Sequence, residues 1–175
     1  MVMLTDDEGR LAVGLARDAV EHYLREGRKV APHGLPEVFD QRRGVFVTLN
    51  RIGEAGKELR GCIGFPYPTH PLKEAIVEAA IGAATSDPRF LPVSLPEMDE
   101  IVVELTVLTE PTPLTCSPLE RVDHIEIGRH GVIVRYGHYQ GLLLPQVAPE
   151  YLSLIHISEP TRPLYTSYAV FCLKK

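Results

Sequence analysis

The chain has 175 residues, 45% of them hydrophobic and 23% charged, which is the profile of a globular protein able to bury a core. Its formal net charge of −5 excludes a broad basic field of the kind that draws proteins onto nucleic acid, and no apolar run approaches the roughly 20 residues of a membrane-spanning helix. Three cysteines without close spacing (Cys62, Cys116 and Cys172) and an acidic N-terminus unlike a secretory signal predict a cytoplasmic protein with reduced thiols.

The N-terminal part of the chain predicts a helix followed by a hairpin. Thr5 and Glu8 form a capping-box pattern, and apolar residues at helical spacing after it predict a helix over 6–26. Two β-rich runs, 44–50 and 58–65, are separated by a glycine-containing turn, so we expect them to pair as a hairpin.

A second helix and a strand follow. Pro71 suits the first turn of a helix that continues to about residue 84, and Thr69 or His70 is the expected cap. Alternating apolar residues then predict a strand over 101–108, with one face turned to the core.

The last predicted elements are short strands beyond a proline-rich stretch at 111–118. They are expected around 124–127, 131–136 and 141–144, with a turn at 137–140 between the final two. The element order favours an α+β fold, in which two helices pack on a mixed or mostly antiparallel sheet.

The C-terminal residues differ in character from the rest. Residues 152–175 resemble translated sequencing-adapter read-through, and Pro160 and Pro163 interrupt both helix and strand patterns there. We therefore expect a domain over 1–151, truncated at its C-terminal end, and a foreign or irregular tail over 152–175. The alternative is a genuine irregular tail.

The most informative stretch is residues 59–64, the LRGCIG segment. Strand alternation places Arg60, Cys62 and Gly64 on one face. A cation beside a thiol can lower the thiol pKa, so we expect Cys62 to be a reactive or acceptor thiol, with His70 or Glu58 as a base. The alternative is that Cys62 is a small buried strand residue.

Further candidates concern binding. Arg60 and Arg89 could clamp a phosphate or carboxylate, the alternative being ion pairs of Arg89 with Asp87 or Glu97 and of Arg60 with Glu58. Gly61 and Gly64 are expected to let a ligand approach closely, unless they mark a simple bulge. Gln146 could offer its amide to the same ligand, or could cap a helix.

Metal and nucleotide cofactors are not indicated. His124, His130 and His138 and the upstream Cys116 show no metal-ligand spacing, and their expected role is that of scattered surface residues. The sequence contains neither a P-loop nor a GxGxxG motif, so no nucleotide cofactor is expected.

Four segments occur together in a diagnostic order. They are the LRGCIG segment, Pro71-Leu72 at the start of a helix, Asp87-Pro88-Arg89-Phe90, and residues 141–147 (GLLLPQV). This set resembles the AMMECR domain family over about residues 5–151. The resemblance implies two unequal lobes with the LRGCIG segment near the cleft between them, and a place in the AmmeMemoRadiSam system beside a Memo-like protein and a radical S-adenosylmethionine enzyme.

Three functions remain open at this point. The first is binding of a small anionic or protein-borne group beside Cys62 within a radical S-adenosylmethionine pathway. The second is a non-catalytic binding or adaptor module whose LRGCIG segment is a packing or docking surface. The third is nucleic-acid binding through a basic cluster (Arg42, Arg43, Arg51, Lys57 and Arg60), which the acidic net charge disfavours.

Overall fold

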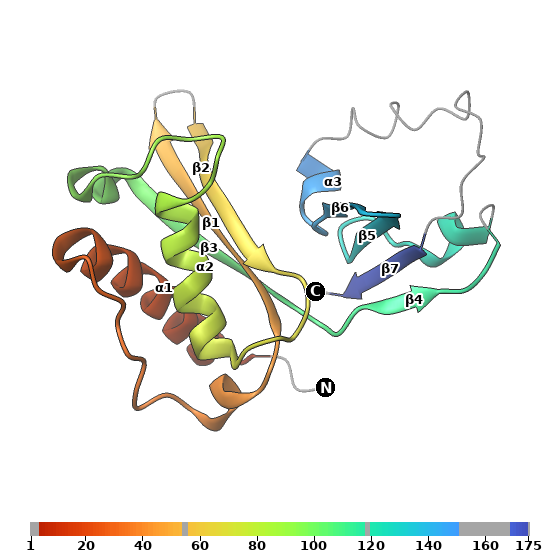
Figure 1. Ribbon diagram of the computed structural model, residues 1–175, viewed down its shortest axis with the longest axis horizontal. Coiled ribbons are helices and arrows are strands. Elements are labelled where there is room, and N and C mark those ends of the chain that lie inside the picture. Colours follow the sequence, from red (N-terminus) through yellow and green to blue (C-terminus); the bar gives the residue numbers. More distant parts are fainter. Residues whose placement is uncertain (1–3, 54–55, 118–119, 151–168, 175) are drawn as a thin grey trace. The chain divides into compact units, whose positions relative to one another are not determined.

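A computed structural model describes residues 4–53, 56–117, 120–150 and 169–174 (Figure 1). The helices and strands are α1 (Asp6–Glu26), β1 (Gly44–Gly53), β2 (Gly56–Phe65), α2 (Leu72–Thr85), β3 (Ile101–Leu108), β4 (Thr112–Leu114), β5 (His130–Tyr136), β6 (Tyr139–Leu143), α3 (Val147–Glu150) and β7 (Ala169–Lys174). They form two compact units, residues 1–107 and 108–175. Every strand pair whose register is resolved is antiparallel, so the predicted α+β class is confirmed.

Helix α1 begins and ends as the sequence predicts. The Thr5 hydroxyl accepts a hydrogen bond from the Glu8 backbone N–H at 3.3 Å, and the Glu8 carboxylate accepts one from the Thr5 backbone N–H at 2.7 Å. Gly27 closes the helix in the left-handed region, with φ 69°, where a residue without a Cβ is favoured.

The first unit is built on the sheet β2-β1-β3, with β1 in the centre. Helix α2 packs on β1 and β2, and α1 packs on α2 (Figure 1). Both helices bury many small residues, which lets their backbones approach the neighbouring elements closely. The buried alanines are Ala12, Ala16, Ala19, Ala75, Ala79, Ala80, Ala83 and Ala84.

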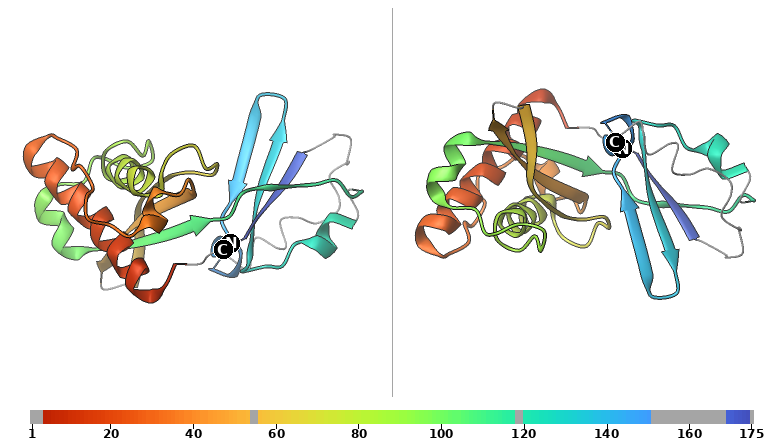
Figure 2. Two further views of the ribbon diagram at one scale, coloured as in Figure 1. Left: turned by 90° about the horizontal axis from the view of Figure 1, so that it is seen from below. Right: turned by 90° about the horizontal axis from the view of Figure 1, so that it is seen from above.

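The second unit contains the sheet β4-β7-β5-β6. Strands β5 and β6 pair as a hairpin, drawn in light blue in Figure 2, and the predicted turn between them is confirmed, with Gly137 at φ 57°. Strand β7 pairs with β4 on one side and β5 on the other. The predicted foreign origin of residues 152–175 stays a prediction, since the structure describes only 169–174 of them.

Three local predictions were wrong. The expected strand at 124–127 does not form, because the short 3₁₀ helix Glu120–His124 extends to its first residue and a turn follows at 127–129. The start of this 3₁₀ helix is fixed by hydrogen bonds from Ser117 to the Glu120 carboxylate. Strand β4 was missed because it is short and contains Pro113, which an edge strand tolerates. The N-cap of α2 is Pro71 and makes no side-chain cap hydrogen bond.

Among the described residues, no helix combines the length and apolarity needed to cross a membrane.

Candidate functional site at the edge of β2

The LRGCIG segment occupies the second half of β2, the edge strand of the first sheet. Cys62 lies opposite Thr48 of β1. The register shifts between Leu49 and Asn50, so Arg60 has no partner residue on β1 and is the extra residue of a β-bulge. We predicted a shared face for Arg60 and Cys62 because side chains alternate strictly along a strand, and the bulge interrupts that alternation.

Asp87 completes the open edge of β2 at Cys62. Its carboxylate accepts a hydrogen bond from the Cys62 backbone N–H at 2.9 Å, where a neighbouring strand would otherwise supply a carbonyl. The same carboxylate accepts hydrogen bonds from Nε and Nη2 of Arg89, at 2.9 and 2.7 Å. Its side chain is 1% exposed, and the Arg89 guanidinium is the main reason that the pKa of Asp87 falls to about 2.

Arg60 holds the segment that follows α2, residues 87–97. Its guanidinium pairs with the Glu97 carboxylate and donates to the Leu91 carbonyl oxygen at 2.8 Å. The Arg60 guanidinium also lowers the pKa of Glu97, because it stabilises the charged carboxylate. Residues 87–97 are therefore fastened to the edge of β2 at two points, by Asp87 and by Arg60.

The two arginines of the predicted anion clamp, Arg60 and Arg89, are paired with carboxylates of the protein itself. The guanidinium carbons of Arg60 and Arg89 lie 6.0 and 5.3 Å from the centre of the Phe90 ring, so the two cations do flank one side chain. Each is paired with a carboxylate of the chain, however, as the alternative anticipated. The Arg89 partner is Asp87 as expected.

The predicted pairing of Arg60 with Glu58 was wrong. Arg60 pairs with Glu97, and Glu58 pairs with Arg51. The reason is the bulge, which gives Arg60 a position on β2 that strand alternation does not describe.

The environment of Cys62 stabilises a neutral thiol. Burial raises its pKa above the ordinary value, and this effect outweighs the hydrogen bond from the Thr48 hydroxyl to Sγ (3.2 Å) and the charge of Arg89, both of which lower it. The direction is opposite to the one that a thiolate nucleophile requires. The nearby cation that acts on the thiol is Arg89, whereas the sequence pointed to Arg60.

The two glycines of the segment are close-approach positions, but the approaching atoms belong to the protein. A Cβ on Gly61 would lie 2.1 Å from the Ala83 carbonyl oxygen of α2. A Cβ on Gly64 would lie 2.2 Å from the Val45 carbonyl oxygen and 2.5 Å from the Phe46 ring. The space above these glycines, where we expected a ligand, is filled by atoms of α2 and β1.

The remaining predicted site residues lie elsewhere. The His70 ring packs against the Phe65 ring with centres 5.3 Å apart and planes tilted by 52°, and its Nδ1 is 2.8 Å from the Thr69 hydroxyl. It lines a groove of about 380 Å³ with Glu74 and Glu78 of α2. Gln146 belongs to the second unit, directly before α3, and its expected place beside the LRGCIG segment stays a prediction.

One polar residue was missed by the sequence analysis. Asn50 is 5% exposed, and its Nδ2 has no hydrogen-bond partner among the described residues. It lies two residues from Thr48 on β1, on the same face of the sheet. A single asparagine in a β-rich run carries no pattern that would have identified it.

The basic cluster is largely neutralised. Arg51 pairs with Glu58, Lys57 with Glu104 and Arg60 with Glu97. In the described ranges, no group of three or more His, Cys, Asp and Glu residues is arranged to hold a metal ion.

Comparisons with known proteins show which proteins this chain resembles in sequence and in structure. The AMMECR1 family model matches residues 13–160. A protein of Methanosarcina mazei is 54% identical over 152 residues, covering 85% of this chain and 74% of that protein. A protein of Methanocaldococcus jannaschii is 53% identical over 152 residues, covering 86% and 74%. An uncharacterised protein of Pyrococcus horikoshii has a crystal structure with a TM-score of 0.86 and 42% identity, covering 98% of this chain and 90% of that chain. This chain belongs to the AMMECR1 family.

Proposed function

We propose that the protein is a non-catalytic, cytoplasmic protein-binding module, in which the LRGCIG segment anchors a docking loop. The docking loop is residues 87–92. The observation that carries this proposal is that polar groups of the segment hold the loop, through Asp87 on the Cys62 backbone and Arg60 on the Leu91 carbonyl, while Leu91 is 83% exposed.

A single exposed leucine is common on protein surfaces and indicates little alone. Leu91 differs because its backbone is fixed in place by a guanidinium. A loop ordered before binding loses less conformational entropy on association, so an apolar side chain on it contributes more to affinity. Phe90 and Arg89 lie beside it, and aromatic and arginine residues are enriched at the energetic centres of protein interfaces.

The partner is a protein with an apolar pocket for Leu91 and a carboxylate at the rim of that pocket. The carboxylate would meet Arg89, whose side chain is 54% exposed although it is paired with Asp87. The family resemblance names two candidates to test, the Memo-like protein and the radical S-adenosylmethionine enzyme.

The test is a binding measurement by biolayer interferometry with each purified candidate partner. Leu91→Asp should weaken binding by about 30-fold, which corresponds to a hot-spot loss of about 2 kcal/mol. Ile52→Asp is the matched control, because Ile52 is a 50% exposed apolar residue at the hairpin end of β1. Equal affinities for the wild type and Leu91→Asp, or no binding of the wild type to either partner, would contradict the proposal.

A second candidate function is supported by Asn50. Its buried Nδ2, which has no partner in the part of the chain that the structure describes, could donate to a small anionic or protein-borne group held beside Thr48 and Cys62, with Cys62 as an acceptor thiol. Asn50→Ala separates the two functions, because it removes the donor beside Thr48 and leaves the anchors of the docking loop in place: a binding module keeps its partner affinity, whereas an enzyme loses turnover. If Cys62→Ser leaves the product of the radical S-adenosylmethionine pathway unchanged, the thiol has no role in the reaction.

A further inference from the structure

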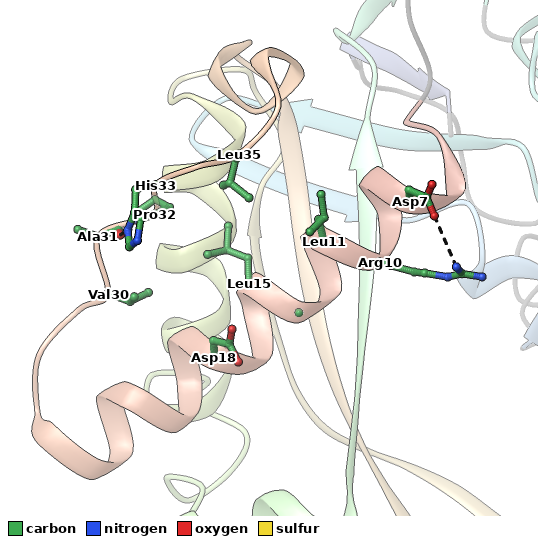
Figure 3. A pocket seen from close by; sticks show the side chains of 11 residues that line it. Asp7, Arg10, Leu11, Leu15, Asp18, Val30, Ala31, Pro32, His33 and Leu35 are labelled. Carbon is green, nitrogen blue, oxygen red and sulfur yellow. Dashed lines mark hydrogen bonds and ion pairs between the residues drawn. The ribbon is translucent and has the colours of Figure 1, made fainter.

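A groove of about 600 Å³ lies between α1 and the connection that follows it, residues 27–36 (Figure 3). In Figure 3, Leu11 and Leu15 of α1 and Leu35 of the connection line its apolar part, and Asp18 lies on α1 beyond Leu15. The lining residues of α1 recur at intervals of three and one, so they form one stripe along the helix. They are Asp7, Arg10, Leu11, Gly14, Leu15 and Asp18.

Gly14 is the unusual member of this stripe. A glycine inside a helix destabilises the helix relative to alanine. No described residue requires it, because a Cβ at Gly14 would meet nothing within 4 Å apart from the nearby backbone of α1 itself, and its φ is not in the left-handed region. The absent side chain instead leaves the groove open at its middle, where another backbone could approach α1 closely.

The wall of the groove opposite α1 is formed by residues of the connection and offers few main-chain groups to an added β-strand. Pro32 has no backbone N–H to donate, and the Ala31 carbonyl oxygen already contacts Nδ1 of His33 at 3.0 Å. An extended partner would therefore find few free main-chain groups on this wall. A helix satisfies its own backbone and needs only side-chain contacts, so it fits such a groove better.

The charges of the stripe specify the partner further. Asp18 makes no ion pair within the described part of the chain, and Asp7 pairs only with Arg10 at 3.5 Å, with both side chains exposed. Such an exposed pair contributes little to stability and is easily exchanged. The two aspartates lie about 16 Å apart along α1, at about 1.5 Å per residue.

We propose that this groove binds an amphipathic helix of a partner protein. The apolar face of that helix packs on Leu11, Leu15 and Leu35 and crosses α1 at Gly14. Lysine or arginine residues about three turns apart on the partner helix face Asp7 and Asp18. This surface is distinct from the docking loop, so the proposal stands independently of the proposed function.

The experiment uses the full chain and two synthetic helical peptides of about 18 residues, or about 27 Å. Both carry leucines along one face; one has lysine at the two positions facing Asp7 and Asp18, and the other has glutamate there. Fluorescence anisotropy should show saturable binding of the lysine peptide and at least about tenfold weaker binding of the glutamate peptide. Amide NMR shifts should move at Gly14, Ala31 and His33.

Gly14→Leu fills the groove and should weaken the lysine peptide at least about tenfold. Gly9→Leu is the matched control, because Gly9 is also in α1, also has open space at its Cβ, and lies outside the groove. Both variants replace glycine with a better helix former, so both should fold. No saturable binding of the lysine peptide, equal affinity for both peptides, or unchanged binding by Gly14→Leu would overturn the proposal.

Discussion

The edge of β2 and the groove beside α1 are both on the surface of the first unit, but they use their polar groups differently. At the edge, Asp87 and Glu97 neutralise the two arginines, and protein atoms fill the space above Gly61 and Gly64. In the groove, Asp18 has no ion-pair partner in the described ranges. The difference shows that the most recognisable segment of the chain supports the fold, whereas the groove, which contains none of the four diagnostic segments, keeps at its surface a carboxylate that is unpaired in the described part of the chain.

The largest expected effect tests whether Gly61 serves packing. Gly61→Ala places a methyl group against the Ala83 backbone oxygen, which cannot move without displacing α2, so the free energy of unfolding should fall by about 3 kcal/mol. Urea denaturation followed by circular dichroism measures it. Gly82→Ala is the control, because its Cβ would meet the Ile63 side chain at 3.1 Å and that side chain can adjust. Equal stability of Gly61→Ala and the wild type would contradict the packing role.

Removal of the Asp87 carboxylate should be nearly as costly. Asp87→Ala leaves the Cys62 N–H and the Arg89 guanidinium without their acceptor, so we expect a loss of about 2–3 kcal/mol in urea denaturation. Asp87→Asn keeps one oxygen acceptor and should lose less. If Asp87→Ala unfolds at the wild-type urea concentration, the carboxylate does not hold this edge.

The pH dependence of stability isolates the charge of Asp87. Its pKa is about 2 in the folded protein, below the ordinary value of 3.8, so its stabilisation is complete above about pH 5. As pH falls from about 5 to 2, the unfolded chain takes up the proton first, and about 2 kcal/mol is lost. Urea midpoints at several pH values should therefore fall more steeply for the wild type than for Asp87→Asn. Parallel slopes for the two proteins would show that the carboxylate is not stabilised in the folded state.

The smallest effect concerns the groove. Gly14→Ala and Gly9→Ala should each stabilise the protein by about 0.5–1 kcal/mol, because alanine is the better helix former and neither Cβ meets another atom. Thermal unfolding measures the gain. A destabilised Gly14→Ala beside a stabilised Gly9→Ala would mean that Gly14 is needed for packing, which would remove its value as evidence for a binding surface.

Local patterns predicted much of the first unit. The capping box of Thr5 and Glu8, the hairpin and the alternation in β3 depend on neighbouring residues, and they appear where expected. The expected helix and strand ranges agree closely because the hydrophobic period is long and regular there. Strand β4 was missed because a short edge strand containing Pro113 has no such period.

The candidate site was harder to predict because it depends on contacts between distant residues. The sequence shows that Arg60 is near Cys62 along the chain, but not that Arg60 would be the bulge residue and reach Glu97. Burial, which raises the pKa of Cys62, is likewise set by tertiary packing. The pairing of Arg89 with Asp87 was predictable, since only Pro88 lies between them in the chain.

We infer that the LRGCIG segment is a structural anchor with a neutral thiol, and the pH dependence of alkylation at Cys62 tests this inference. Peptide-resolved mass spectrometry, with Cys116 as an internal comparison, should give Cys62 an apparent pKa above the free-thiol value of about 8.5. Thr48→Val should raise it further, because the hydrogen bond to Sγ is lost. An apparent pKa below about 7 would contradict this account and would identify Cys62 as a thiolate prepared for chemistry.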